Sequence, residues 1–454
     1  MREPVGGMAC GVRWAAFAAP GTGPGLRCAS SGLRKLRGLR GALLGLALLW
    51  LPPASAGEPG LGADLGGVLA HARMHHPGFA ADTLEAAAAR AGAGAAGALP
   101  DPRFTIELMD VNNAMSGRND FSVLPGQVGE TRYRVVQMLP WRGKRALEAQ
   151  AADALAAARE AAVDAGWREL AGSLKAAWLR YWSASHELAL YREQLGTLAA
   201  LEDAALARYR SGAGSQQAVL RAQGEHTELR LRIASAEQAL AGARAALNGL
   251  LDRPADAALA APGALPALPR PDAAALFERL RSEHPALASL GMQIDAARLS
   301  AERTRLERYP DVGVGLTYNR PRNGITSYDL MLEMNIPLQR APRHARELEA
   351  ERMREAAAAR RSAEEARLRG ALGSALAALE GARTRESLTA ASLLPQVSAG
   401  FEAARAAYAA GRADFDTVLE AWRRLQDSRL ALLGAQADGR MALFELQSLA
   451  GEEL

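Results

Sequence analysis

The tetrapeptide Tyr209-Arg-Ser-Gly212 recurs 199 positions later as Tyr408-Ala-Ala-Gly411. The same offset relates three further landmarks of each copy, namely Val219-Leu220-Arg-Ala222 with Val418-Leu419-Glu-Ala421, Leu247 with Leu446, and Leu250 with Leu449. An offset that holds over so many landmarks indicates an internal duplication, in which one structural unit of roughly two hundred residues is used twice. We therefore look for function in what a pair of such units builds.

The duplication extends upstream with small changes of offset. His76-Pro77 corresponds to His284-Pro285 at an offset of 208, and Pro140 corresponds to Pro337 at an offset of 197. The first copy has an extra 13 residues before Pro140, in the neighbourhood of Asn112 to Val128. Because insertions cost little in surface loops, we expect a longer loop at this place.

The amino-terminal segment has the three parts of an export signal. Four basic residues precede an apolar run at 41–51, and Ala54-Ser-Ala56 then supplies the small residues that a signal peptidase reads. We expect residues 1–56 to be a signal peptide, and the long stretch before its apolar run indicates a misassigned start. The basic residues are Arg34, Lys35, Arg37 and Arg40.

Removal of residues 1–56 would change the chemistry of the chain. The segment holds seven Lys/Arg and one Asp/Glu, so the net charge would fall from +4 to −2, which removes the argument for a nucleic-acid-binding surface. Both cysteines, Cys10 and Cys28, lie in it, so we expect no disulfide and no Cys-ligated metal. The first mature residue would be Gly57 and not Cys, which predicts export without lipidation.

Four segments alternate apolar and polar residues with a period of two. In the clearest of them, Val312, Val314, Leu316 and Tyr318 alternate with Gly313, Gly315, Thr317 and Asn319. This period predicts strands that have one apolar and one polar face. We expect the strands at about 102–112, 131–139, 311–320 and 327–337.

The length of these strands and the position of their tyrosines are typical of strands that span a membrane. Each has about nine or ten residues, the length that crosses a bilayer at a tilt of about 45°, and tyrosines lie near the strand ends as in an interfacial belt. Four strands cannot close a barrel, and lipid does not tolerate an open sheet edge. A membrane interpretation therefore requires an oligomer to which each chain contributes strands, and a half-buried sheet in a soluble protein is the alternative.

Helical patterns fill most of the remaining chain. No proline occurs between Pro140 and Pro254, and apolar residues from Leu229 to Leu250 follow a heptad spacing. We expect long antiparallel helical hairpins at about 144–251 and 341–451, although the spacing alone would also fit an ordinary coiled coil. Each hairpin should turn at its Tyr-x-x-Gly, since glycine reaches left-handed backbone angles without steric cost.

These elements define the expected domain organisation. The first repeat covers residues 57–254 and holds an N-terminal helix, two strands and one hairpin. A linker at 255–273 leads to the second repeat at 274–454, which holds a helix, two strands and one hairpin. The fold class is therefore mostly α with a small β part, internally duplicated.

Two motifs could carry chemistry but have simpler explanations. Gly92-Ala-Gly94-Ala-Ala-Gly97 matches a dinucleotide fingerprint, yet it follows a helical pattern and precedes a strand, the reverse of the required order, so we expect a loop of small residues. His75-His76 with His71 leaves a weak surface metal site open, whereas a solvated helix end before Pro77 is the other interpretation. Without a catalytic triad, paired acid-base carboxylates or a P-loop, the sequence predicts no enzyme, no cofactor and no resident metal.

In their order, the motifs of the exported chain resemble those of the TolC-like outer membrane efflux proteins, in particular the branch that serves heavy-metal and related RND pumps. They are Leu99-Pro-Asp-Pro102 before a strand, Val136-Gln-Met-Leu-Pro140-Trp-Arg-Gly143-Lys144 where strand becomes helix, and the two Tyr-x-x-Gly turns. The resemblance implies a homotrimer that pools twelve strands into one transmembrane β-barrel in the outer membrane lipid. Twelve helices would continue it as an α-barrel in the periplasm, served by a periplasmic adaptor protein and an inner-membrane RND pump.

The resemblance also assigns candidate residues to a pore gate. Family members close the periplasmic end with acidic residues in a Val-Leu-acid-Ala setting, which makes Glu420 the gate candidate, with Asp414 and Asp416 as weaker ones. Three such acids related by symmetry would form a ring that favours cations. The first copy has Arg221 at the place of Glu420, so the ring would hold three acids and not six. Thr417 stands where a second acid is sometimes found.

The tip residues Tyr209, Gly212, Tyr408 and Gly411 resemble the adaptor-docking turns of the family. We expect a trimeric outer membrane channel, a passive conduit that exports metal cations or organic toxicants. The alternative is a periplasmic coiled-coil adaptor or structural protein. An adaptor would have one hairpin inserted in a β-rich domain, whereas here two hairpins each follow a strand pair.

Overall fold

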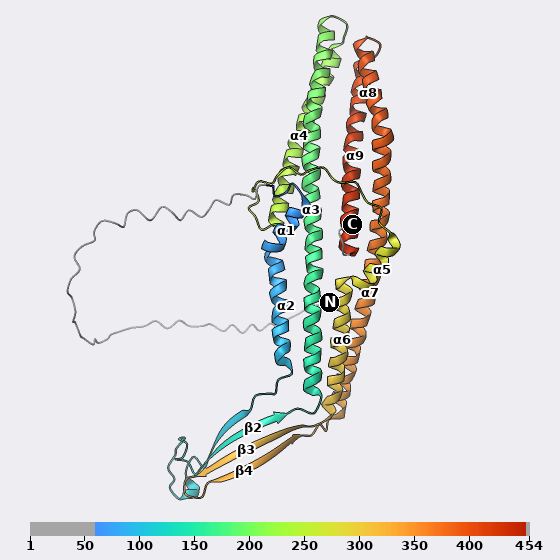
Figure 1. The fold of residues 1–454 in the computed structure, drawn as a ribbon. Helices are drawn as coiled ribbons and strands as arrows, with labels where there is room; N and C mark the ends of the chain where they lie inside the picture. Colours follow the sequence, from blue (N-terminus) through green and yellow to red (C-terminus); the bar gives the residue numbers. More distant parts are fainter. Residues whose placement is uncertain (1–59, 451–454) are drawn as a thin grey trace, which may run out of the picture. The chain divides into compact units, whose positions relative to one another are not determined.

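The computed structural model describes residues 60–450. The expected signal peptide, with Cys10 and Cys28, and the expected first mature residue, Gly57, lie outside the described residues. Residues 57–454 form one compact unit, so the two repeats are packed together and are not separate bodies. This unit is mostly helical with a small antiparallel sheet, as the sequence predicts (Figure 1).

The two copies use the same order of elements. The elements of the first copy are α1 (Leu65–His75), α2 (Pro77–Ala96), β1 (Arg103–Met109), β2 (Glu130–Leu139), α3 (Lys144–Arg210) and α4 (Gln216–Leu250). Those of the second copy are α5 (Ala273–Glu283), α6 (Pro285–Arg305), β3 (Asp311–Pro321), β4 (Ser327–Asn335), α7 (Arg340–Leu388), α8 (Leu394–Ala409) and α9 (Phe415–Ala450). Among residues 60–450, no helix combines the length and the apolar character that crossing a bilayer requires.

The copies differ in the ascending helix of the hairpin. In the first copy α3 runs for 67 residues without a break, a length of about 100 Å. In the second copy a π-helical turn at Thr389–Leu393 separates α7 from α8. Pro395 lies just after this turn and lacks the N–H that would continue the α-helical ladder, so the wider turn accommodates its ring. The equivalent residue of α3 is Gly196, which leaves the ladder intact.

The long helix α3 is the centre of the helical part. Near the sheet it packs against α2 and α6, where Ser289 donates a hydrogen bond of 2.9 Å to the carbonyl of Ala158. Nearer its tip it packs against α4 and α9. One apolar core lies between the two hairpins and includes Leu198, Ala222, Val418 and Trp422, so the hairpins are packed on each other in this state.

Two equivalent leucines, one in each copy, allow the packing of the two repeats to be compared. Leu247 and Leu446 are related by the offset of the duplication, and both are fully buried. Leu247 packs in a cluster with Trp178 and Trp182 of α3, whereas Leu446 packs against α5 and α7. The heptad pattern therefore places each copy of the leucine in a core of its own.

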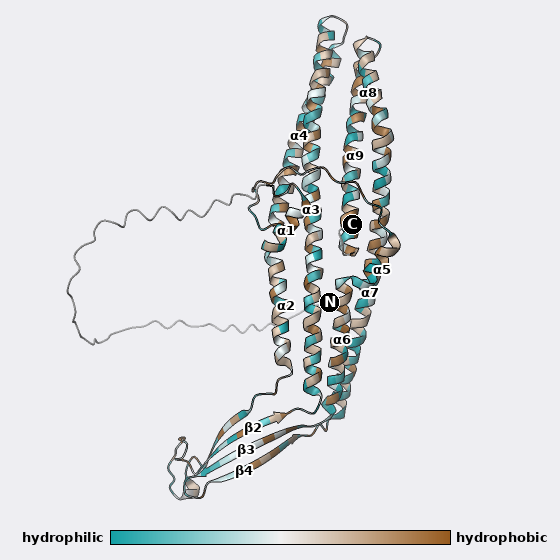
Figure 2. Ribbon diagram, viewed as in Figure 1, coloured by the Kyte–Doolittle hydropathy of each residue, from teal (hydrophilic) through white to brown (hydrophobic). Residues whose placement is uncertain are grey.

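The sheet has the strand order β1-β2-β3-β4 with all neighbours antiparallel. Direct partners across it are Phe104, Val135, Leu316 and Leu330, so apolar residues of the four strands share one face. Both hydrophobic and hydrophilic residues occur along the strands (Figure 2). Arg134, Thr317 and Asp329 are aligned on the other face. Within the described chain, β1 and β4 each keep one edge without a strand partner.

The extra residues near 112–128 form a loop that is held by hydrogen bonds of its own side chains. Asn113 is fully buried, and its Nδ2 donates hydrogen bonds to the carbonyls of Asp120 and Gln127. Asp110 accepts hydrogen bonds from the backbone of Ala114 and Met115 at the start of a 3-10 turn. The insertion therefore keeps a defined conformation.

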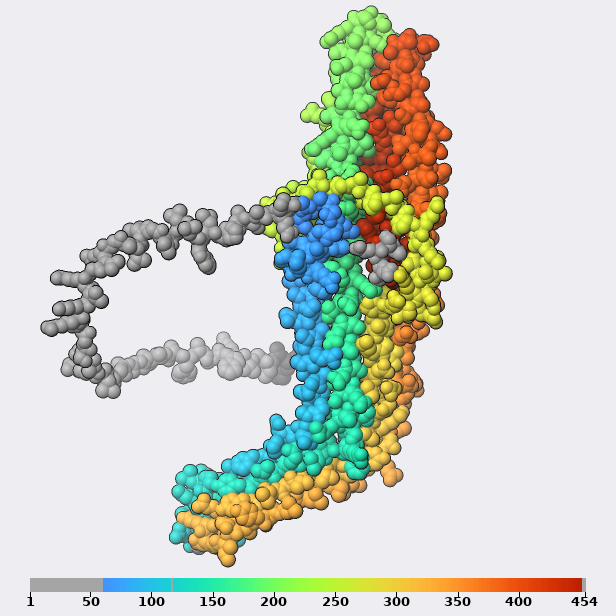
Figure 3. All heavy atoms as spheres, in the orientation of Figure 1, coloured from blue at the N-terminus to red at the C-terminus, as the bar shows by residue number. Residues whose placement is uncertain are grey.

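A segment between α4 and α5 crosses the helices as a strap (Figure 3). Tyr181 and Trp182 of α3 donate hydrogen bonds to carbonyls of this segment, at Ala260 and Gly263. Arg440 of α9 donates to the carbonyl of Pro266. The strap is thus tied to both hairpins.

The glycine-rich motif is not a loop, which corrects the sequence-based expectation. Gly92 and Gly94 lie inside α2, and Gly97 is its C-cap. A side chain at Gly97 would approach the Cβ of Ala149 to 2.9 Å, so small residues allow α2 to pack closely on α3. His76 accepts a hydrogen bond from the backbone N–H of Phe79 and caps α2, in agreement with the helix-end interpretation.

Candidate functional site at the hairpin tips

The two Tyr-x-x-Gly motifs form the turns at the ends of the hairpins. Gly212 has a φ of +75° and Gly411 a φ of +72°, both in the left-handed region that favours glycine. In each turn the glycine N–H donates a 3.0 Å hydrogen bond to the carbonyl of the tyrosine three residues earlier. The backbone of the duplicated turn is therefore the same in both copies, as the sequence predicts.

The helices after the turns begin with equivalent caps. Ser215 accepts a hydrogen bond of 3.2 Å from the backbone of Ala218, and Asp414 accepts one of 2.9 Å from the backbone of Thr417. The hydroxyl of Thr417 also donates to Asp414, and these hydrogen bonds hold the pKa of Asp414 below its ordinary value. The carboxylate of Asp414 thus starts α9, which is a structural role that its spacing in the sequence does not reveal.

The two tip tyrosines have different environments. Tyr408 is 6% exposed and Tyr209 is 45% exposed. The guanidinium of Arg208 lies 4.6 Å from the centre of the Tyr408 ring and donates to the Tyr408 carbonyl. The residue equivalent to Arg208 in the second copy is Ala407, so the second repeat supplies no such cation to Tyr209. Burial raises the pKa of the Tyr408 hydroxyl.

Three ion pairs join the hairpins below the Arg208–Tyr408 contact. Arg221 of α4 lies 2.5 Å from Asp416 of α9. Arg423 of α9 pairs with Glu225 of α4, whose side chain is only 7% exposed. Arg429 of α9 lies 3.0 Å from Glu193 of α3. We call these three pairs, together with the Arg208–Tyr408 contact, the inter-hairpin bridges.

Glu420 takes no part in these bridges. Its carboxylate is exposed and lies 2.6 Å from Arg424, one turn further along the same helix. Arg221, which occupies the place of Glu420 in the first copy, pairs with Asp416 instead. The duplication therefore predicts where the charges differ, but not which of them meet.

A small cavity of about 300 Å³ lies between the two tips. Among the residues that line it are Arg208, Arg221, Tyr408, Asp414 and Asp416. The structure thus brings three of the candidate residues together with two arginines that the sequence analysis did not assign to a site. The only available signal for these arginines was a difference between the copies, Arg208 against Ala407 and Arg221 against Glu420.

The core between the hairpins contains polar atoms without hydrogen-bond partners. They are Nε2 of Gln194, Nε1 of Trp422 and Oε1 of Gln426, all on buried side chains of α3 and α9. An unpaired buried polar atom costs about 1–3 kcal/mol. The interface between α3 and α9 is therefore less stable than its apolar residues alone would make it.

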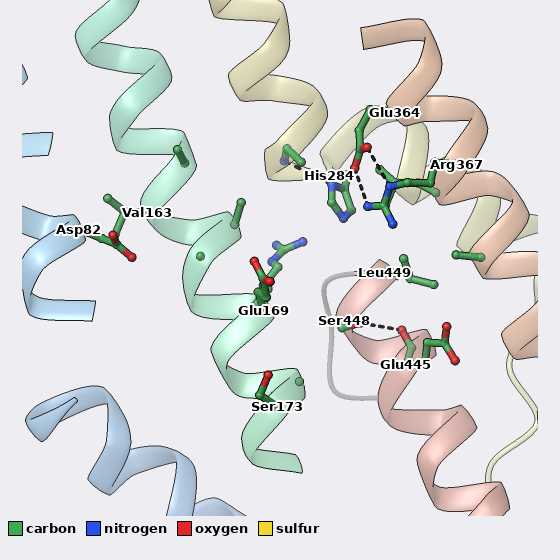
Figure 4. Close-up of a pocket in the computed structure, with 18 of the residues that line it drawn as sticks. Asp82, Val163, Glu169, Ser173, His284, Glu364, Arg367, Glu445, Ser448 and Leu449 are labelled. Atoms are coloured by element: carbon green, nitrogen blue, oxygen red, sulfur yellow. Dashed lines mark hydrogen bonds and ion pairs between the residues drawn. The ribbon is translucent and has the colours of Figure 1, made fainter. Parts of the chain in front are cut away.

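Another cavity lies away from the tips, where α9 ends and α6 begins (Figure 4). It has a volume of about 860 Å³ and is lined mainly by charged and small side chains of α2, α3, α7 and α9. His284 lies in it and caps α6, and burial together with the nearby Arg168 lowers its pKa. Hydrogen bonds from Arg367 lower the pKa of Glu364.

Two of these charged side chains form an ion pair. No group of three or more His, Cys, Asp or Glu side chains that could hold a metal ion occurs in the part of the chain that the structure describes. Glu364 and Arg367 are joined to each other, and Ser448 is bonded to the carbonyl of Glu445 within its own helix. We assign no chemistry to this cavity.

One family model matches part of the chain. Residues 276–452 match the family model described as "Outer membrane efflux protein". A comparison with curated proteins gives no significant match.

Several solved structures share the fold over most of its length. CusC, whose crystal structures concern folding and transmembrane channel formation, is 18% identical with a TM-score of 0.73, covering 86% of this chain and 92% of its own. The outer-membrane channel OprN is 16% identical with a TM-score of 0.73, covering 86% and 90%. The outer membrane protein VceC of Vibrio cholerae is 16% identical with a TM-score of 0.71, covering 85% and 96%.

The fold places each helical hairpin directly after a strand pair, which does not fit an adaptor with one hairpin inserted in a β-rich domain. The family model covers the second repeat, and the solved channels share the fold of both repeats. Residues 276–452 therefore carry an outer membrane efflux protein domain, and the chain has the fold of TolC-like outer membrane channels.

Proposed function

We propose that three copies of this chain form a passive conduit of a tripartite efflux system, with the sheet in the outer membrane and the helices in the periplasm. The observation that carries the proposal is the four-stranded sheet with one apolar face and two open edges. A single open sheet of this kind is unfavourable both in lipid and in water, because its edges would expose unpaired backbone N–H and C=O groups. Twelve strands from three copies close the edges and turn the polar faces inward.

The dimensions of the sheet fit a bilayer. Strand β3 has 11 residues and is about 36 Å long, which at a tilt of about 40° spans roughly 27 Å. Near one end, Tyr133, Tyr318 and Tyr328 stand in a row across three strands with ring centres 5.2–6.1 Å apart. Near the other end, Trp141 and Tyr309 are stacked at 5.0 Å. Aromatic groups near both ends of the strands are typical of the two interfaces of a membrane.

The hairpin tips are the proposed gate. The inter-hairpin bridges hold the two hairpins together in the closed state, and Asp416 contributes to them directly. Glu420 and Asp414 add negative charge close to the same place, and three symmetry-related sets would favour cations in a narrow pore. We therefore propose metal cations as the cargo, loaded by an inner-membrane RND pump.

The tip turns are the proposed docking place of a periplasmic adaptor. Tyr209 is exposed on one tip, and Gly212 and Gly411 give both turns the same backbone. Tyr408 is buried beneath Arg208, so its role there is to join the tips and not to contact the adaptor. An adaptor that binds at the turns would act directly on the inter-hairpin bridges.

Two experiments test the proposal. Fractionation should recover the chain in the outer membrane as a trimer, and recovery as a soluble periplasmic monomer would contradict it. A deletion strain should become more sensitive to copper, silver, zinc, cobalt or cadmium than to common drugs. A strain sensitised only to drugs would keep the conduit and reject the metal cargo.

A further inference from the structure

A third cavity lies at the junction between the sheet and the helices. It has a volume of about 710 Å³ and lies between the start of α3, the end of α6 and the start of α7. Its lining includes four cations, namely Lys144, Arg303, Arg343 and Arg346. Apolar side chains at its rim come from the segment that joins β4 to α7.

Three of the four cations already have carboxylate partners. Lys144 lies 2.7 Å from Asp311, Arg303 lies 3.6 Å from Glu148, and Arg346 lies 3.5 Å from Glu307. Arg343 differs from them, because no carboxylate of the described residues lies within ion-pair distance of it. Its Nε donates to the carbonyl of Gln339, which leaves the outer nitrogens of the guanidinium for another acceptor.

A second arginine extends the positive charge along the same helix. Arg340 precedes Arg343 by three residues on α7, so the two lie on neighbouring turns of one side. Arg340 is exposed and, within residues 60–450, also lacks a carboxylate partner. A guanidinium pairs with a phosphate through two parallel hydrogen bonds, so this side of α7 suits a phosphate group.

The rim of the cavity is apolar and open. Ile336 is 61% exposed and Leu338 is 81% exposed, and Ile336 continues the alternation of the apolar face of β4. Trp141 and Tyr309 lie at the same end of the sheet. Exposed aliphatic side chains beside uncommitted arginines, at the edge of a membrane-sized apolar face, match a phospholipid, whose phosphate lies next to its acyl chains.

We propose that this junction binds an anionic phospholipid of the periplasmic leaflet, with Arg343 and Arg340 holding the phosphate and Leu338 and Ile336 contacting the acyl chains. The inference rests on the proposed placement of the sheet in the outer membrane. Each trimer would then carry three such sites. A bound lipid would fix the depth of the barrel and stabilise the junction at which strand becomes helix.

The test measures lipid that remains on the purified trimer. The full chain is reconstituted in vesicles of phosphatidylethanolamine with phosphatidylglycerol, extracted in mild detergent, and the retained phosphatidylglycerol is counted by mass spectrometry. Each surface arginine contributes roughly a fivefold preference for anionic lipid, so Arg343→Gln should lower retention by about fivefold and Arg340→Gln/Arg343→Gln by more. Leu338→Ser should also lower it.

Arg352→Gln is the matched control. Arg352 lies on the same helix and is already paired with Glu355 at 2.6 Å, so retention should not change. Arg343→Lys keeps the charge and should keep most of the lipid, which guards against a variant that only misfolds. Equal retention by the wild type, Arg343→Gln and Arg352→Gln would overturn the inference. Retention that inorganic phosphate abolishes and Leu338→Ser leaves intact would also overturn it, because the site would then bind phosphate without acyl chains.

The same vesicles separate this inference from the proposed function. Failure of the wild type to float with vesicles of either neutral or anionic lipid would reject the membrane placement itself. Insertion with normal channel conductance but no preference for phosphatidylglycerol would reject only the lipid site.

Discussion

Arg221 on α4 and Asp416 on α9 form an ion pair of 2.5 Å across the two hairpins, although they are not equivalent positions of the duplication. At the offset of 199, Arg221 corresponds to Glu420 and Asp416 corresponds to Gln217. The pair is therefore made by two positions at which the copies have diverged. It is one of three ion pairs that join the two hairpins within the described residues.

Loss of this link should favour the open state of the channel. Exposed ion pairs contribute about 0.2–1 kcal/mol each, so Asp416→Asn in three chains should shift the closed–open equilibrium by roughly three- to hundredfold. Single-channel recording in planar bilayers would show this as larger or more frequent openings.

The matched control for this change is Asp438→Asn. Asp438 lies on the same helix and pairs with Arg385 at 3.1 Å, but this pair is inside one hairpin. The exchange of both charges, Arg221→Asp with Asp416→Arg, should restore closure. Equal currents for the wild type, Asp416→Asn and Asp438→Asn would exclude the bridge from gating.

Glu420 should influence selectivity more than closure. Its carboxylate is exposed and pairs only with Arg424 of the same helix, so Glu420→Gln removes negative charge without breaking an inter-hairpin bridge. We expect a lower preference for cations, measured as a shift of the reversal potential in a salt gradient. Glu402→Gln, which removes an acid paired with Arg405 on α8, is the control. An unchanged reversal potential in Glu420→Gln would make Glu420 an ordinary surface residue.

The two equivalent leucines should contribute similarly to stability. Leu247 and Leu446 are both fully buried, and truncation of such a side chain leaves a cavity that costs about 2–5 kcal/mol. Leu247→Ala and Leu446→Ala should each lower the thermal midpoint of the trimer by several degrees, as followed by intrinsic tryptophan fluorescence. Leu231→Ala, at a 64% exposed position of α4, should leave the midpoint nearly unchanged. A large effect of only one buried variant would mean that the two cores relax differently.

Acid should weaken the region around His284. Burial lowers the pKa of His284, and Arg168 and Arg367 lower it further, whereas Glu364 opposes them. The unfolded chain therefore binds a proton more readily than the folded chain, so the stabilising contribution is complete above pH of about 6.5 and is lost as the pH falls below it.

The variant His284→Asn should remove this pH dependence. Asparagine can still cap α6, so the thermal midpoint of the variant should fall less between pH 7 and pH 5 than that of the wild type. His76→Asn makes the same change at the corresponding cap of the first copy and controls for the geometry of the cap. Parallel pH profiles for the wild type and His284→Asn would contradict the assignment.

The elements of the fold follow closely from local patterns in the sequence. The alternation from Val312 to Asn319 predicts a strand with two unlike faces, and the register of β3 with its neighbours aligns those faces across the sheet. The glycine-rich segment was misread as a loop because glycine normally weakens a helix. In α2 the small residues are used for close packing on α3, a contact between residues about fifty positions apart.

The candidate site was only partly predictable from the sequence, because it too depends on contacts between residues that are far apart in the chain. Asp414, Asp416 and Tyr408 were identified, and they line one cavity with Arg208 and Arg221. Their roles were not, because Asp414 caps a helix and Tyr408 is buried beneath Arg208. Such roles depend on partners that lie close in space and far apart in sequence.

By itself, the sequence determined the duplication, the strand faces and the hairpin turns, because each depends on the spacing of residues or on the backbone freedom of one glycine. Only the tertiary structure decided that Arg221 meets Asp416, that Glu225 is buried against Arg423, and that Arg343 has no carboxylate partner among residues 60–450. The spacing of charged residues along the sequence does not show which of them form ion pairs. Which charged residues form ion pairs depends on how α9 packs against α3 and on where the strands place the start of α7.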